Sequence, residues 1–153
     1  MAVLNPISGD FIDFVKQVIA STGLVPSGNV FDEREKDLLW IVSSEVQAIG
    51  DIAVMVSLPS IAHDEGSAMA TGYKVSLTLS LRCCKALSEV DSHAIAETIF
   101  RSFVGARFYH GASAAEAADE NANVYADSLR HSSKGSDSLH TMTITYNEQI
   151  QPQ

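Results

Sequence analysis

Residues 72–82 alternate strictly between apolar and polar side chains. The apolar positions are Tyr73, Val75, Leu77, Leu79 and Leu81, and the polar positions are Lys74, Ser76, Thr78, Ser80 and Arg82. Because successive side chains of a strand point to opposite faces of a sheet, the pattern predicts a strand with one buried face and one face of hydroxyls and cations. Residues 139–150 repeat it, with Met142, Ile144 and Tyr146 opposite Thr141, Thr143 and Thr145. Both segments are predicted to lie in one half-polar sheet.

Two other segments have the spacing of amphipathic helices. Residues 8–23 place apolar side chains three and four positions apart, with Ser8 and Asp10 as predicted caps and Gly23 as the predicted stop. Residues 88–105 begin with a Ser-x-x-acid signal and carry an apolar stripe that ends before Gly105. We expect this second helix to pack its stripe on the apolar face of the strand over 72–82.

The remaining hydrophobic segments are shorter. Apolar runs predict strands over 38–42 and 52–58. Residues 124–129 form a further candidate strand, followed by a polar break over 131–137. Residues 111–122, rich in Ala and acidic side chains, are interpreted as a short exposed helix or a linker.

Two polar segments stand out between these elements. Residues 59–72 are predicted to form a long loop that is either mobile or used for contact, because a usual hairpin connection has only two to five residues. The six charged residues 32–37 are interpreted as a solvated loop at a strand end. Together the segments predict one α+β domain over residues 1–153, in which residues 1–9 form an N-terminal arm. Its sheet is expected to be mostly antiparallel, with two amphipathic helices packed on one face.

Composition and charge bear on which partners the protein can bind and where it is assembled. The formal net charge is −9, which disfavours specific nucleic-acid binding because phosphate contacts need clustered Lys and Arg. The first residues lack the pattern of a secretory signal, so we expect assembly in the cytoplasm. The only two cysteines, Cys83 and Cys84, are adjacent and are expected to be free thiols, since neighbouring cysteines make no ordinary loop-closing bridge.

No arrangement of side chains predicts catalysis. Five histidines are scattered without a metal-binding spacing, namely His63, His93, His110, His131 and His140. The chain also has no GxGxxG, no GxxxxGK[ST] and no GxSxG motif. We therefore expect no enzyme activity, no metal and no cofactor, and a protein that works through contact.

The order of features resembles that of the tail terminator proteins of tailed bacteriophages, also called neck or tail-completion proteins. The resemblance lies in the strand "YKVSLTLSLRC", followed by the helix "SHAIAETIFRSFVG" and then by "VYADSLRHSSKGSDSLHTMTITYNEQIQP". The N-terminal helix "DFIDFVKQVIASTG" completes the pattern. The resemblance implies a virion protein that forms a hexameric ring at the head-proximal end of the tail, ends tail-tube polymerisation and provides the head-docking surface.

The resemblance also implies partners and contact residues. The partners would be further copies of the chain, the tail tube protein and a head-completion connector protein, with genomic DNA passing through without specific binding and no membrane involved. The candidate interface residues are Arg34, Glu35, Ile61, Asp64, Glu65, Met69, Lys74, Ser76, Thr78 and Arg82. Alternatives are a tail tube subunit, a head-completion connector ring protein, or an unrelated small α+β binding domain or enzyme.

Overall fold

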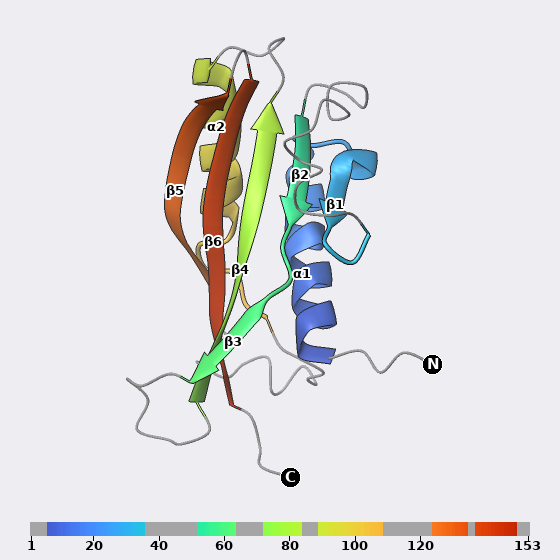
Figure 1. Ribbon diagram of the computed structural model, residues 1–153, viewed down its shortest axis with the longest axis vertical. Coiled ribbons are helices and arrows are strands. Elements are labelled where there is room, and N and C mark those ends of the chain that lie inside the picture. The colour runs from blue at the N-terminus through green and yellow to red at the C-terminus, as the bar shows by residue number, and fades with distance from the viewer. Residues whose placement is uncertain are drawn as a thin grey trace.

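The computed structural model describes residues 6–35, 52–63, 72–83, 89–108, 124–134 and 137–149 (Figure 1). The described elements are α1 (Pro6–Thr22), the short 3-10 helix η1 (Ser27–Asn29), β1 (Val30–Asp32), β2 (Ile52–Val56), β3 (Ser60–His63), β4 (Gly72–Cys83), α2 (Glu89–Ser102), β5 (Val124–Lys134) and β6 (Asp137–Gln149). Within these residues no helix is long and apolar enough to cross a membrane.

The described strands form a six-stranded sheet in the order β1-β2-β4-β6-β5, and β3 also pairs with β4. Only β1 and β2 pair in parallel, and the other pairs are antiparallel. The long strands β4 and β6 form its centre (Figure 1). This arrangement confirms the predicted α+β class with a mostly antiparallel sheet.

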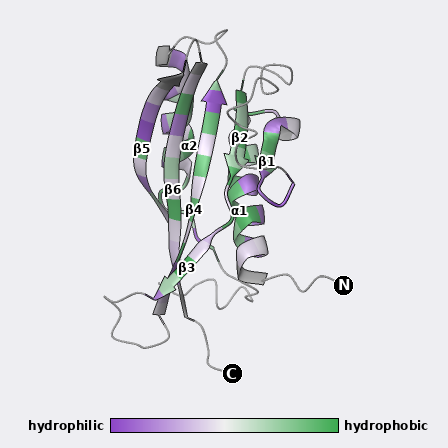
Figure 2. Ribbon diagram, viewed as in Figure 1, coloured by the Kyte–Doolittle hydropathy of each residue, from purple (hydrophilic) through white to green (hydrophobic). Residues whose placement is uncertain are grey.

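Alternation along β4 and β6 separates an apolar face of the sheet from a polar one. Val75 lies opposite Tyr146, Leu77 opposite Ile144 and Leu79 opposite Met142, and all six side chains are buried. Polar and apolar bands alternate along β4 in Figure 2. The register is determined by this pattern, because a slip of one residue would move the apolar side chains of a strand to the polar face.

Both helices contribute to one hydrophobic core with the apolar face of the sheet. The fully buried helix side chains in this cluster are Phe11, Ile12, Val15 and Ile19 of α1 and Ala96 and Ile99 of α2, joined by Phe103 just after it. Helix α1 lies against β1 and β2, whereas α2 lies against β5 and β6 (Figure 1). The expected packing of α2 on the apolar face of β4 is only part of the arrangement, because α2 lies mainly against the neighbouring strands β5 and β6 while sharing one hydrophobic core with β4.

The helix ends are only partly as predicted. Gly23 directly follows α1 with a φ of 70°, a conformation that glycine takes without steric cost, which confirms this stop. Gly105 also has a positive φ, of 80°, but α2 ends at Ser102, so the second helix stops three residues earlier than predicted. The predicted caps Ser8 and Asp10 are wrong, because α1 begins at Pro6 and both residues lie inside it. Proline suits a first helical position, since its φ is already helical and its missing N–H has no partner to lose.

Three segments differ from the sequence-based expectation. Asp32 ends β1 and is 0 % exposed, so the charged run does not begin as a solvated loop. The expected loop over 59–72 contains β3, which pairs with the first part of β4. The expected polar break over 131–137 is largely strand, because β5 continues to Lys134 and β6 begins at Asp137. The predicted strand over 38–42 and the segment 111–122 lie outside the described residues.

Candidate functional site

The polar side of the sheet is the largest surface that the sequence predicted. We call it the hydroxyl face and define it as Lys74, Ser76, Thr78, Tyr125, Asp127, Arg130, Thr141, Thr143, Thr145 and Asn147. These residues project from β4, β5 and β6 on the side opposite the buried residues of β4 and β6. The pattern that predicted this face is therefore confirmed by the strand register.

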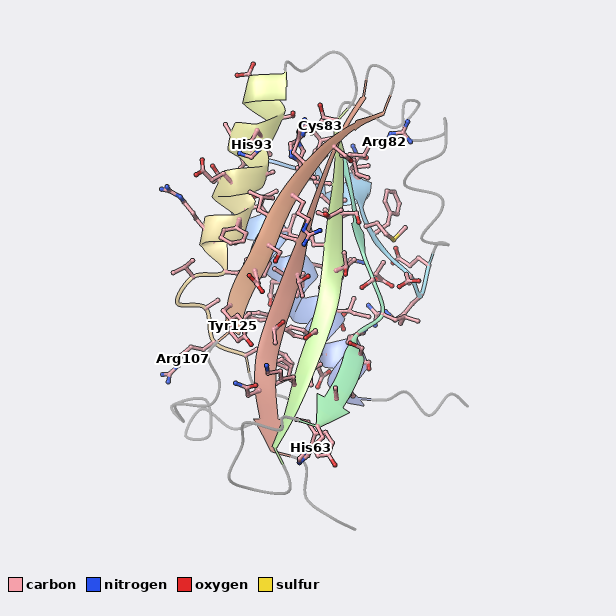
Figure 3. All side chains as sticks on the ribbon, turned by 60° about the vertical axis from the view of Figure 1, so that its left-hand side comes forward. His63, Arg82, Cys83, His93, Arg107 and Tyr125 are labelled. Carbon is pink, nitrogen blue, oxygen red and sulfur yellow. The ribbon has the colours of Figure 1, made fainter. Side chains whose placement is uncertain are left out.

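Strand register arranges the hydroxyl face in rows that cross the sheet. One row runs from Ser60 through Ser76 and Thr145 to Tyr125, and the next joins Thr78, Thr143 and Asp127. The Ser76 Oγ lies 3.0 Å from the Thr145 Oγ1, so neighbouring strands are linked by side-chain hydrogen bonds as well as by backbone. Tyr125 is 41 % exposed at the outer strand (Figure 3). Such rows give a polar surface able to exchange hydrogen bonds with water or a partner.

The polar positions of β4 are not all exposed. Lys74 and Thr78 are exposed and Ser76 is half-buried, but Ser80 and Arg82 are only 7 % and 8 % exposed. Their strand neighbours on β2, Met55 and Ala53, are fully buried. The expectation that Arg82 lies on an exposed cationic surface is therefore wrong. Because Ala53 and Met55 are buried on the same face, this end of the polar side of the sheet is closed to solvent as a whole.

Arg34 and Glu35, predicted as contact residues, belong to an ion-pair network at the end of β1. Asp32 accepts hydrogen bonds from Lys16 Nζ at 2.9 Å and from Arg34 Nε at 3.0 Å. Arg34 Nη2 also donates to Asp13 Oδ1 at 2.7 Å, and Lys16 Nζ donates to Glu35 Oε1 at 3.4 Å. The network ties α1 to the edge strand β1, so both predicted residues have a structural role.

Electrostatics in this network favours the ionised states of Asp32, Lys16 and Arg34. Burial opposes ionisation of Asp32, but hydrogen bonds from Arg34 and Lys16 outweigh it and lower the pKa of Asp32 to about 2. Burial would lower the pKa of Lys16, yet the hydrogen bond and charge of Asp32 raise it. The hydrogen bond to Asp32 likewise raises the pKa of Arg34. A carboxylate with so low a pKa is unsuited to general acid–base chemistry near neutral pH.

The remaining predicted interface residues do not lie on the hydroxyl face or lie outside the described residues. Ile61 of β3 is 37 % exposed, and its strand partner is the inward-facing Val75, so it lies off the hydroxyl face. Asp64, Glu65 and Met69 lie outside the described residues. The structure thus brings Lys74, Ser76 and Thr78 together on one exposed surface and places Arg34 and Glu35 at a different edge.

Histidines form a cluster that sequence spacing did not predict. His93 of α2, His131 of β5 and His140 of β6 lie with ring centroids 4.7 to 6.4 Å apart. The expectation that the histidines are scattered is therefore wrong for these three. One sequence signal was present, since His140 occupies an inward position of the alternating strand over 139–150. His63, in contrast, contacts Tyr73 edge-on at 5.6 Å at the far end of the sheet.

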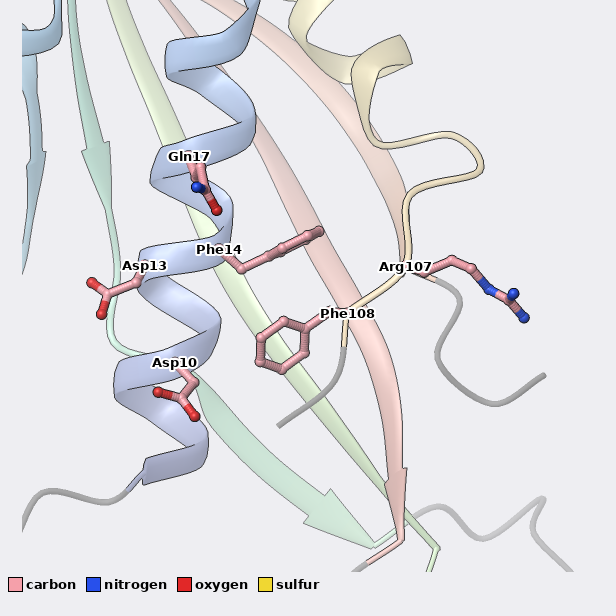
Figure 4. A pocket seen from close by; sticks show the side chains of 6 residues that line it. All are labelled: Asp10, Asp13, Phe14, Gln17, Arg107 and Phe108. Atoms are coloured by element: carbon pink, nitrogen blue, oxygen red, sulfur yellow. The ribbon is translucent and has the colours of Figure 1, made fainter. Parts of the chain in front are cut away.

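A pocket of about 340 Å³ opens between α1 and the segment after α2. It is lined by Asp10, Asp13, Phe14, Gln17, Arg107 and Phe108. The Phe14 and Phe108 rings are in tilted contact, with centroids 5.1 Å apart and an interplanar angle of 51°, whereas the Arg107 side chain points away from them (Figure 4). Asp13 is engaged by Arg34. Among the lining residues that the structure describes, no set of polar groups is aimed at one point, as a small-molecule site needs.

The described side chains provide no evident catalytic centre. No group of three His, Cys, Asp or Glu side chains among them is arranged to hold a metal ion. Cys83 forms no disulfide and is 1 % exposed at the end of β4 (Figure 3), whereas Cys84 lies outside the described residues. In comparisons with known proteins, the chain matches no protein-family model and no curated protein.

Proposed function

We propose that this chain is a structural virion protein of a tailed bacteriophage. It forms a ring at the head-proximal end of the tail, ends polymerisation of the tail tube and provides the surface to which the filled head docks. The observation that carries the proposal is the hydroxyl face, a surface of hydroxyls and scattered charges of both signs spread over three neighbouring strands. A face of hydroxyls with few charges suits a ring interior, along which a polymer moves without a strong binding site.

The edges of the sheet support assembly from identical copies. Among the described strands, β5 pairs only with β6 and β3 pairs only with β4. Edge strands present unpaired backbone groups that template a further strand. Since β3 and β5 run antiparallel to one another, the β5 edge of one copy can continue the sheet onto the β3 edge of the next. Such a head-to-tail contact closes into a ring when the rotation between copies fits.

Charge agrees with passage of DNA rather than binding. Each copy carries −9, so six copies at −9 each carry −54. The hydroxyl face itself carries Lys74, Arg130 and Asp127, so repulsion of phosphates comes from the net negative charge of the whole ring rather than from this face. Adjacent rings of tail tube protein and connector protein are the proposed partners on the two sides of this ring, which makes it a virion component assembled in the bacterial cytoplasm.

Complementation of assembly tests the proposed function. Extracts of cells infected by a phage with a stop codon in this gene should contain filled heads and tails that do not join. Adding the purified chain should restore infectious particles, counted as plaques. If the extracts are already fully infectious without it, or stay inactive after it is added, the proposal fails. Extracts lacking tubes altogether would assign the chain to the tail tube instead, and leaking heads beside normal tails would assign it to the connector.

A matched pair of variants tests the role of the hydroxyl face in the same assay. Thr78→Arg places a cation on the exposed centre of this face and should reduce rescue, because it creates a phosphate-binding group where DNA moves. Thr98→Arg makes the same change at an exposed position of α2, away from the sheet, and should rescue as well as the unmodified chain. Equal rescue by both variants would contradict a role of this face.

A further inference from the structure

The three clustered histidines join α2 to the β5–β6 hairpin. His131 and His140 face each other as a cross-strand pair, with ring centroids 4.7 Å apart. His93, labelled on α2 in Figure 3, completes the cluster, with its ring centroid 5.6 Å from the His140 ring and 6.4 Å from the His131 ring. The cluster therefore sits at the interface between a helix and two strands, where a change in charge acts on the packing of all three.

His140 is the buried member of this cluster. It is 0 % exposed, and its Nε2 lies 3.2 Å from the Ser92 Oγ of α2. Its Nδ1 has no hydrogen-bond partner among the described residues. A neutral imidazole donates from one nitrogen and carries a lone pair on the other. The geometry thus fits a neutral ring that donates from Nε2 to Ser92, and a proton added at Nδ1 would give a buried cation without a described acceptor.

The surroundings offer little to stabilise such a cation. His93 and Ser92 face His140 from α2 and His131 faces it from β5, while its neighbour on β4 is the apolar Leu81. Arg82 and Arg130 lie at positions of the opposite sheet face. Among the described residues, no carboxylate forms an ion pair with the three rings, and Glu97 pairs with Arg101 instead. Ser92 and His93 also lie near the start of α2, where the helix dipole is positive and disfavours cations.

We propose that His93, His131 and His140 form a pH-sensitive latch, which holds the start of α2 on the β5–β6 hairpin at neutral pH and releases it under mildly acidic conditions. The release follows from mutual repulsion of imidazolium rings less than 7 Å apart and from the cost of a charge at the buried position. This inference rests on the cluster alone and is independent of the proposed role in a virion.

Linkage gives the direction of the effect. Burial, together with the charges of His131 and His93, lowers the pKa of His140 to about 4, whereas a histidine in an unfolded chain titrates near 6.5. Between these values the unfolded or released state binds one more proton than the latched state. Stability therefore falls as the pH falls through this window. One such proton changes the opening equilibrium constant by roughly tenfold per pH unit.

Hydrogen exchange combined with a non-titrating variant tests the latch. Amides of α2 should show an opening equilibrium constant about tenfold larger at pH 5 than at pH 6, after correction for intrinsic exchange rates. Amides of α1, which lies against β1 and β2, should change less. The variant His140→Gln keeps a polar side chain that does not titrate, so its α2 opening should lose most of this pH dependence. The control His63→Gln removes an exposed histidine outside the cluster and should behave as the unmodified chain.

If His140→Gln does not fold, NMR titration of the histidine side chains in the unmodified chain tests the latch without a variant. In the unmodified chain one histidine should titrate well below pH 6, and it should be the one that is protected from solvent. Titration of all histidines near 6.5, or α2 opening that is independent of pH between 6 and 5, would overturn the latch. Equal pH dependence of α2 opening in the unmodified chain and in His140→Gln would overturn it as well. Chelator in the buffer excludes trace metal as the cause of any difference.

Discussion

Asp32 shows how one residue decides whether a charged segment is a loop or part of the fold. Sequence composition predicts a solvated run over 32–37, yet the Asp32 carboxylate is fully buried and accepts hydrogen bonds from Lys16 and Arg34. Breaking a buried charge network by removing one partner leaves the other charges without compensation. The anchoring of α1 to β1 therefore depends on a carboxylate that composition alone assigns to solvent.

Replacing Asp32 with Asn should destabilise the protein by about 2 to 4 kcal/mol, because charge-assisted hydrogen bonds to both cations are lost. Urea unfolding at neutral pH measures this change. The control Glu35→Gln removes a half-exposed partner 3.4 Å from Lys16 and should cost less than about 0.5 kcal/mol. Equal losses for the two variants would contradict the central position of Asp32.

Acid should remove the advantage of Asp32 over Asn. Its folded pKa of about 2 lies below the ordinary value of 3.8, so the unfolded state takes up the proton first as the pH falls. The contribution of Asp32 is complete above about pH 4 and is lost as the pH falls towards 2. The stability difference between the unmodified chain and Asp32→Asn should therefore shrink over that range. A difference that is constant from pH 5 to pH 2 would contradict the assignment.

At the scale of a single element, β5 contains a bulge that the sequence pattern does not predict. Its register shifts between Asp127 and Arg130, and Ser128 adopts a φ of 59°. This conformation is strained for any residue with a Cβ and costs glycine almost nothing. The bulge lets Leu129 pack against the core while Arg130 returns to the hydroxyl face. A strand predicted to end at 129 thus continues to Lys134.

Replacing Ser128 with Gly should stabilise the protein by up to about 1 kcal/mol, since the strain at positive φ is relieved. Thermal unfolding measures the gain. The matched change Ser132→Gly falls in the regular part of β5 opposite Leu139 and should destabilise the protein, because glycine lowers strand stability. Destabilisation by both variants would mean that the bulge imposes no strain at Ser128.

At the scale of the whole molecule, the sequence predicted local patterns well and distant neighbours poorly. The sequence predicted the apolar–polar alternation of β4 and β6 and the apolar faces of α1 and α2, because each pattern depends on residues a few positions apart. The histidine cluster was not, since His93 and His140 meet only through the register of a hairpin and the docking of a helix. Strand β3 was hidden in a polar segment, because its four residues are all exposed and leave no apolar pattern.

Ring assembly through the sheet edges predicts a specific cross-link. Ser60 of β3 and Tyr125 of β5 lie in one row at opposite edges, three strand spacings apart, or about 14 Å. A short bis-maleimide cannot join cysteines at these positions within one copy. In assembled particles the double variant Ser60→Cys/Tyr125→Cys should therefore give a ladder of bands ending at six copies. Each single variant should remain monomeric, because its cysteine has no second thiol opposite it across this contact. A double variant that gives no ladder would contradict pairing of β3 with β5.

The length of tails made without this protein tests the proposed function most directly. Negative-stain electron microscopy of a lysate in which this gene carries a stop codon would measure that length. The ring account predicts tubes that continue beyond the normal length and remain unattached to filled heads, because nothing ends their polymerisation. Tails of normal length joined to heads would contradict the proposal that this protein ends tube polymerisation and docks the head.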